Sequence, residues 1–170
     1  IDDINGLRYV IEEMHFSSSP GRMAMLATSW SAEVEIINQR LDEEAKYIAY
    51  LSNPKQKKGM QEVAIHLCEL MNVSGSIETV RQPQVVCSDI DLFELKRLAL
   101  IADKVRRLAE QYDLEILQCH TLSKVIDILD VDGDRLPSFY ISDNYSPVLR
   151  SLRKQMAQTS DETERDELAI

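Results

Sequence analysis

The sequence predicts an all-α fold, and three observations support this prediction. Of the 170 residues only five are glycine and five are proline, so few positions would interrupt a helix. Leucine, alanine, glutamate, glutamine, arginine and lysine are plentiful, and these residues favour helices. Apolar residues recur at spacings of three and four, which places them on one face of a helix. A chain of this length, 44% hydrophobic, can form one domain with a buried core.

The first half of the chain divides into four expected helices. Two of them begin where a proline follows a serine or asparagine, a pairing typical of a helix start. The expected ranges are about 3–15, 20–27, 32–51 and 54–72. The residues expected to face inward are Leu7, Val10, Ile11, Met14, Met23, Leu26, Ala27, Ile37, Leu41, Ala45, Ile48, Met60, Val63, Ala64, Leu67 and Met71.

The second half contains the most regular helix pattern. Ser88 followed by Asp91 resembles a capping box, and a helix is expected from there to Tyr112. Apolar residues along it alternate spacings of three and four, which is typical of a bundle seam: Leu95, Leu98, Ala102, Val105, Ala109 and Tyr112. Further apolar residues widen this face, so more than one neighbour must cover it. Residues 76–88, which precede the helix, are ambiguous.

Two shorter patterns complete the helical assignment. Thr121 can cap a helix that ends near Leu129, and Ser146–Pro147 predicts the start of a last helix with Leu149, Leu152 and Met156 inward. Apolar residues become rare after Gln158. We therefore expect a helical domain over 1–158 and the frayed start or stub of a long helix over 159–170, within a longer protein.

The composition restricts the classes of partner. The net charge is −10, so the segment should bind nucleic acid weakly or not at all, since such binding depends on lysine and arginine. Three cysteines without a framework spacing predict reduced thiols and a cytoplasmic protein. Neither a membrane span nor a signal peptide is evident, and no membrane partner is expected.

The stretch "DVDGDRLPSFYISDNYSP", Asp130 to Pro147, stands out from the helical pattern. Its aspartates suggest a calcium loop, but the glycine lies at position 4 of such a loop rather than 6, and Ile141 occupies position 12, where glutamate is required. Asp–Gly instead favours a hairpin turn. Phe139 and Ile141 then alternate as in a short strand. We therefore predict one small β-hairpin at about 128–141 in an otherwise helical bundle.

Three segments in this order resemble a known family. "LRYVIEEMHFSSSPGRMAML" at 7–26, "DLFELKRLALIADKVRRL" at 91–108, and the stretch from Asp130 followed by "YSPVLRSLR" are similar to the core/lever domain (domain III) of the MutS family of DNA mismatch-repair and recombination ATPases. In that family a comparable segment precedes long lever helices that lead to the clamp. The resemblance covers about residues 1–158.

The resemblance implies a non-catalytic helical connector that couples an ATPase domain to DNA-binding or clamp elements. The five glycines are too widely spaced for a phosphate loop, so the ATPase domain is absent from this segment. The segment itself would therefore be no enzyme and would hold no catalytic residue, metal or cofactor. The parent protein would bind ATP and Mg²⁺, contact DNA, form a homodimer and hold this segment against its other domains.

Basic clusters are the only candidate contact residues. The simpler interpretation is a solvated helix surface, and the functional one is contact with a phosphate backbone or with an acidic face of another domain: Lys55, Lys57, Lys58, Arg150, Arg153 and Lys154. Histidine and cysteine spacings form no closed zinc site, and a Cys119–histidine nucleophile has no further support. Two alternatives remain, a free-standing acidic helical module for protein interaction and a small cytoplasmic enzyme.

Overall fold

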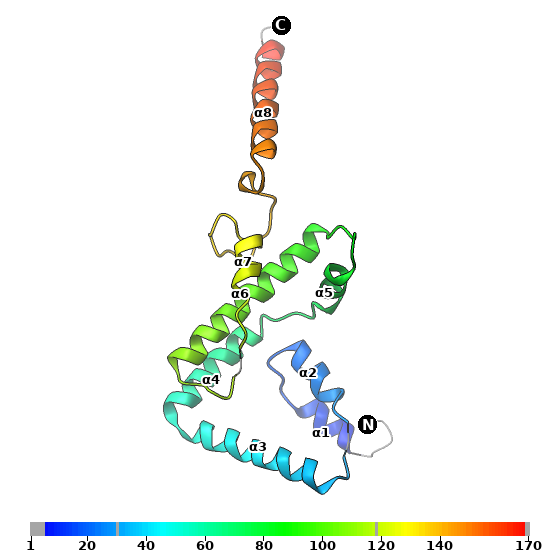
Figure 1. Cartoon of the computed structure of the whole chain (residues 1–170), viewed down its shortest axis with the longest axis vertical. Helices are drawn as coiled ribbons and strands as arrows, with labels where there is room; N and C mark the ends of the chain where they lie inside the picture. The colour runs from blue at the N-terminus through cyan, green and yellow to red at the C-terminus, as the bar shows by residue number, and fades with distance from the viewer. Residues whose placement is uncertain (1–5, 30, 118, 169–170) are drawn as a thin grey trace.

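The computed structural model describes residues 6–29, 31–117 and 119–168, apart from the side chains of residues 7, 8 and 160–168. Within these ranges every regular element is helical, which confirms the all-α prediction (Figure 1). The elements are α1 Leu7–Glu13, α2 Ser19–Leu26, α3 Val34–Ser52, α4 Pro54–Leu67, α5 Ser74–Arg81, α6 Asp89–Gln111, α7 Ser123–Leu129, the 3₁₀ helix η1 Asp143–Tyr145 and α8 Pro147–Leu168. Residues 3–5 of the first predicted helix lie outside the described residues. None of the described helices combines the length and apolarity needed to cross a membrane.

Capping side chains fix the starts of three helices. Ser18 accepts a hydrogen bond from Gly21 N at 3.1 Å, and Asn53 accepts one from Lys55 N at 3.0 Å. Ser88 and Asp91 form the predicted capping box, with Asp91 N donating to Ser88 Oγ at 3.1 Å and Ser88 N donating to Asp91 Oδ2 at 2.9 Å. These bonds satisfy amides that have no partner within the helix, so the sequence sets these boundaries locally.

The core is built around α6, which packs against α4, α5 and α7. This arrangement confirms that several neighbours cover its wide apolar face. One buried cluster joins α4, α6 and the following turn: Val63, Ile101, Val105, Ala109, Tyr112 and Leu114. A smaller one joins α6 to α7: Ala99, Leu100 and Ile126. The predicted seam is buried only toward its C-terminal end, because Leu95, Leu98 and Ala102 remain partly exposed.

The helices α4 and α6 cross at Gly59. This glycine is buried, and a Cβ atom placed on it would lie 2.5 Å from Cβ and 2.6 Å from Cγ of Tyr112. The hydroxyl of Tyr112 donates a hydrogen bond to Glu62 at 2.7 Å. The two helices therefore approach more closely at this crossing than any larger residue would allow.

The structure corrects the sequence assignment between α4 and α6. The helix α4 ends at Leu67 rather than near residue 72, and α5 occupies part of the ambiguous segment. The side chain of Asn72 accepts a hydrogen bond from Ser74 N at 3.1 Å and turns the chain there. The serine and glycine after Asn72 lie in the first turn of α5, where small residues are tolerated, rather than in a loop.

The predicted β-hairpin at about 128–141 is wrong, since no strand forms there. The helix α7 continues to Leu129 and takes up the expected first strand. Asp130 Oδ2 accepts from Arg135 N at 3.1 Å, and Asp134 Oδ1 accepts from Leu136 N at 2.9 Å. The aspartate side chains thus bind backbone amides that would otherwise donate hydrogen bonds to a neighbouring strand. Short polar side chains commonly compete with strand pairing in this way.

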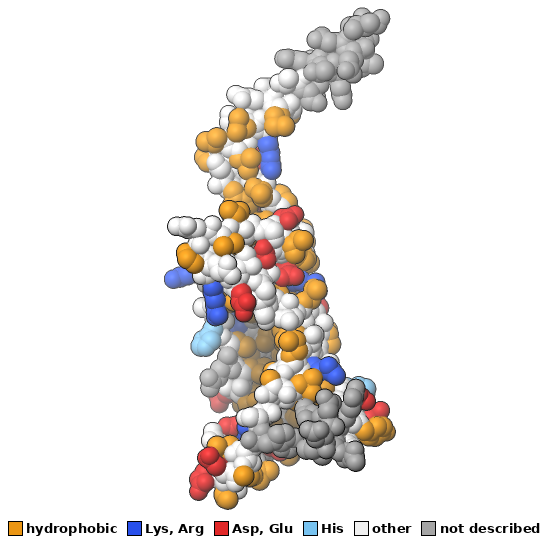
Figure 2. Space-filling view, turned by 90° about the vertical axis from the view of Figure 1, so that its right-hand side faces the viewer, with side chains coloured by type: hydrophobic (Ala, Val, Ile, Leu, Met, Phe, Trp, Pro, Cys, Tyr) orange, Lys and Arg blue, Asp and Glu red, His pale blue; other side chains and the backbone are white. Residues whose placement is uncertain are grey.

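Several predicted inward faces are exposed. This applies to Val10, Met14, Met23, Ile37, Leu41, Ile48, Met71, Leu152 and Met156. Hydrophobic side chains accordingly lie on the surface along the molecule (Figure 2). The chain exposes 13,025 Å², whereas a compact monomer of 19.5 kDa would expose roughly 8,500 Å². The molecule is therefore extended, with α3 along its lower edge and α8 projecting from the opposite end (Figure 1).

Candidate functional site

The stretch from Asp130 to Ser146 forms a polar joint between the helical body and α8. Among the described elements, α8 packs only against η1, so this joint determines its direction (Figure 1). The chain turns where Gly133 N donates to Asp130 O at 2.9 Å. Gly133 has a φ of 67° and Arg135 a φ of 53°, both in the left-handed region. Glycine adopts this region without strain, whereas Arg135 does so at some cost.

The base of the joint is a buried ion pair. Lys96 of α6, 4% exposed, places its Nζ 2.8 Å from Oδ1 of Asp130, which is 7% exposed. Burial acts to lower the pKa of Lys96, but the hydrogen bond and charge of Asp130, with those of Asp134, outweigh it and raise that pKa above its ordinary value. Lys96 is therefore positively charged, and its partner cannot be removed without leaving a buried charge.

Asp134 supports the same lysine from the turn. Its Oδ1 lies 3.4 Å from Lys96 Nζ while accepting the amide of Leu136. The hydrogen bond from Leu136 holds the pKa of Asp134 below its usual value against the effect of desolvation. The turn thus carries two carboxylates to one buried ammonium group.

Asp132 forms the centre of the joint. Its carboxylate accepts hydrogen bonds from Tyr140 Oη at 2.8 Å, Ser142 Oγ at 2.9 Å and Asn144 Nδ2 at 2.5 Å. These bonds, that of Tyr140 above all, hold the pKa of Asp132 below its ordinary value. One side chain thereby fixes three points of the segment that leads into α8.

The C-terminal end of the joint contacts α8 directly. Asn144 accepts a hydrogen bond from Arg150, and Asp143 forms an ion pair with Arg153 at 2.7 Å. The rings of Phe139 and Tyr145 lie 6.4 Å apart at 57°, a tilted contact beside these bonds. A continuous series of polar contacts therefore runs from the aspartates of the joint to the first two turns of α8.

A second charge cluster ties the joint to the middle of α6. Asp103 lies 2.7 Å from Arg135, 2.8 Å from Arg107 and 3.1 Å from Arg106. Desolvation acts to raise the pKa of Asp103, but the hydrogen bonds of Arg135 and Arg106 outweigh it and lower the pKa. Arg135 thus anchors the turn to α6 at a point separate from Lys96.

The predicted basic residues do not form one surface. Lys55, Lys57 and Lys58 begin α4, whereas the other three lie on α8 at the far end of the molecule (Figure 1). Lys55 forms an ion pair with Asp113, and Lys58 lies 3.9 Å from Glu62. Arg150 and Arg153 are held by the joint as described above, and Lys57 and Lys154 are exposed. Arg150 and Arg153 therefore contact the joint while remaining exposed.

Sequence reasoning missed the centre of this site. Lys96 carries a recognisable signal, because it is a lysine within an otherwise apolar face of the longest predicted helix. Tyr140, Ser142 and Asn144 carry none, since their shared partner Asp132 is defined only by the folded loop. The described residues contain no group of three metal-ligating side chains close together.

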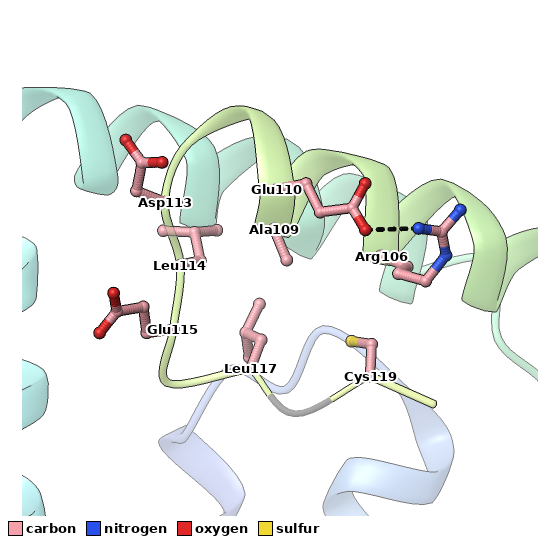
Figure 3. Close-up of a pocket in the computed structure, with 8 residues that line it drawn as sticks. All are labelled: Arg106, Ala109, Glu110, Asp113, Leu114, Glu115, Leu117 and Cys119. Carbon is pink, nitrogen blue, oxygen red and sulfur yellow. Dashed lines mark hydrogen bonds and ion pairs between the residues drawn. The ribbon is translucent and has the colours of Figure 1, made fainter. Parts of the chain in front are cut away.

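A shallow hollow of about 310 Å³ lies at the C-terminal end of α6 (Figure 3). It is lined by Arg106, Ala109, Glu110, Asp113, Leu114, Glu115, Leu117 and Cys119. Glu110 pairs with Arg106 at 2.5 Å, and Asp113 pairs with Lys55. No histidine is among these described lining residues, so the hollow gives the Cys119–histidine nucleophile no support.

Comparisons with protein-family models, with curated proteins and with solved structures find no match for this chain.

Acidification is expected to weaken the joint. Asp132, Asp134 and Asp103 all have lowered pKa values, so their contribution to stability is fully present above about pH 5 and is lost as the pH falls through their folded-state values, below 3.8. Unfolding by urea, followed by circular dichroism between pH 2 and 6, should show this loss. The Asp132→Asn variant should be less stable at pH 6 and should lose less stability on acidification. An equal acid response in the variant and the original chain would contradict the role given to Asp132.

Proposed function

We propose that this chain is a non-catalytic helical connector, similar to the core/lever segment of MutS-like DNA-repair ATPases. One observation carries the proposal. The helix α8 leaves the body through a dense polar joint and packs against no other described element except η1. A connector requires such a projecting element whose direction is fixed by the body.

The joint suits the transmission of a rigid-body movement. A helix of 22 residues is about 33 Å long, so a small rotation at its base becomes a displacement of several ångströms at its tip. Rigid-body rotation of domains is a common route for coupling distant sites. The bonds of Asp132, Asn144 and Asp143 oppose bending at the base, which a flexible linker would allow.

The remaining parts of the proposal come from the sequence resemblance. The parent protein would bind ATP and Mg²⁺ in a different domain, contact DNA through other elements, form a homodimer and reside in the cytoplasm. The large exposed surface supports the expectation that other domains of the same chain cover this segment. The acidic charge of the segment supports a role in coupling rather than in direct DNA binding.

Stiffness of the joint is the first test. Fluorescent probes on Lys104 of α6 and Gln158 of α8, each changed to cysteine after replacement of the native cysteines by serine, report the angle between body and helix. We expect a single narrow distance distribution. Asp132→Ala should broaden it at least twofold, because three donors lose their shared acceptor. Asp127→Ala, at an exposed position of α7, is the matched control. A broad distribution in the original chain would refute a rigid connector.

The MutS-like part of the proposal has a separate test. The longest reading frame that contains these residues is expected to encode a phosphate loop downstream, and its full-length product should hydrolyse ATP faster in the presence of DNA. A full-length product without nucleotide binding would refute the relationship.

The alternative function is a free-standing acidic module that binds proteins. The observation that favours it is the number of exposed apolar side chains combined with a net charge of −10. Such a module would bind its partner without nucleotide, and the joint variant Asp132→Ala would leave that binding unchanged.

A further inference from the structure

The helix α3 carries an apolar stripe that faces solvent. Its members are Val34, Ile37, Leu41 and Ile48, which are 62%, 41%, 56% and 67% exposed, with Ala45 also exposed between them. They recur at helical spacing and therefore lie on one side of α3. In the described structure α3 packs only against α4, which follows it in the chain. The stripe is thus an unpartnered face that runs from Val34 to Ile48 of the 19-residue helix.

The spacing of this stripe is symmetric about its central residue. Relative to Leu41, the other positions lie seven and four residues before it and four and seven residues after it. Two copies of α3 placed antiparallel, with a two-fold axis at Leu41, would bring Leu41 against Leu41 of the second copy. Val34 would then meet Ile48 of the second copy, and Ile37 would meet Ala45. An isologous interface requires this self-complementarity.

We propose that two copies of this chain associate through antiparallel pairing of α3. The symmetric spacing makes the stripe complementary to itself, because each apolar residue of one copy then lies opposite an apolar residue of the other. An unrelated partner helix would impose no such symmetry. The proposal concerns α3 alone, and it does not depend on the connector function assigned to the joint and α8.

The charges beside the stripe also fit a second copy. Arg40 and Glu44 are one turn apart on the same edge of the stripe, and both are exposed. Two-fold symmetry about Leu41 places Arg40 within one turn of Glu44 of the second copy, and the reverse pair forms at the same time. Arg40 makes only a long hydrogen bond of 3.4 Å to Ser29 O, so its guanidinium is available for this contact. Opposite charges in these positions select the antiparallel register.

The position of α3 in the molecule leaves room for the partner. The helix runs along the lower edge of the structure, away from the core around α6 (Figure 1). The chain exposes 13,025 Å², which is roughly 4,500 Å² above the value for a compact monomer of its mass. A stable interface buries about 1,200–2,000 Å² in total. The uncovered surface of the whole chain, of which the α3 stripe is one part, exceeds this area.

Sedimentation of the 170-residue chain across a range of concentrations tests the association. A monomer–dimer equilibrium is expected, and Leu41→Asp should raise the dissociation constant at least tenfold because it places two carboxylates on the two-fold axis. Val86→Asp is the matched control, since Val86 is 90% exposed and distant in sequence from α3. Circular dichroism checks that both variants keep the original helix content. A monomer at all concentrations, or an equal effect of both variants, would overturn the proposal.

Charge reversal separates pairing between copies from effects within one chain. Arg40→Glu and Glu44→Arg should each weaken self-association, because each variant brings like charges together across the axis. An equimolar mixture of the two should form a mixed dimer with both contacts restored. A mixture that associates no better than either variant alone would count against the register.

Single cysteines then determine the orientation. In a background with Cys68, Cys87 and Cys119 replaced by serine, Leu41→Cys should form a disulfide-linked dimer under mild oxidation. Val34→Cys alone should not, whereas a mixture of Val34→Cys with Ile48→Cys should. Linkage of Val34→Cys to itself would indicate a parallel pair and overturn the antiparallel arrangement.

Discussion

Replacing Asp130 with alanine is expected to lower the free energy of unfolding by about 3–5 kcal/mol, since the buried Lys96 loses its close partner and keeps only the longer contact with Asp134 at 3.4 Å. Lys96 Nζ lies 2.8 Å from Asp130 Oδ1, and both side chains are almost fully buried. The amide of Arg135 loses its acceptor in the same variant. Unfolding by urea, followed by circular dichroism, measures the loss.

Two further variants test whether the loss of stability comes from the buried ion pair. Lys55→Ala removes a pair with Asp113 in which both side chains are more than half exposed, so it should cost less than about 1 kcal/mol. The double variant Lys96→Met with Asp130→Leu should recover most of the stability, because apolar residues of similar size can replace a buried pair. If Asp130→Ala costs no more than Lys55→Ala, Lys96 is not confined as the structure shows.

The parts of the fold that could be predicted from sequence are those set by neighbouring residues. Asn53 and the pair Ser88–Asp91 cap helices as expected, and α2 is capped one residue earlier than expected, by Ser18 rather than Ser19; a cap requires only a polar side chain two or three residues before an amide. The wide apolar face of α6 also predicted several neighbours. The breadth of this apolar face indicates that more than one helix must cover it, and α4, α5 and α7 do so.

The parts that could not be predicted depend on distant partners. The apolar stripe of α3 was assigned correctly to one face, but periodicity does not state whether a neighbour covers that face. The hairpin was predicted from Asp132–Gly133, a local turn signal. It is absent because Asp130 instead meets Lys96, which lies 34 positions earlier in the chain, and its second oxygen binds the amide of Arg135.

The candidate site shows the same limit. Arg150 and Arg153 were selected from sequence as basic contact residues, and the sequence did not indicate their bonds to Asn144 and Asp143. Asp132 was considered as a calcium ligand and then as a turn residue. Its role as a shared acceptor requires Tyr140, Ser142 and Asn144 to fold back upon it. Only the tertiary structure of the loop defines that arrangement.

Gly59→Ala is expected to destabilise the protein, although alanine is the better helix former. In an exposed helix, replacing glycine with alanine would raise the free energy of unfolding by about 1 kcal/mol. Here the new Cβ would lie 2.5 Å from Cβ of Tyr112, so the crossing of α4 and α6 must open. Overpacking of this kind costs about 1–3 kcal/mol, and displacement of Tyr112 also strains its hydrogen bond to Glu62. Thermal unfolding should therefore show a clear fall in Tm.

The cause can be assigned by two companion variants. Gly75 lies in α5 with no atom within 4 Å of an added Cβ, so Gly75→Ala should leave the stability unchanged or raise it by up to about 1 kcal/mol. Tyr112→Ala removes the ring that the new methyl group meets. In that background Gly59→Ala should no longer destabilise the chain, and a double-mutant cycle should give a coupling energy of about 1–3 kcal/mol between the two positions. Additive effects would mean that steric contact with Tyr112 is not what requires glycine at this crossing.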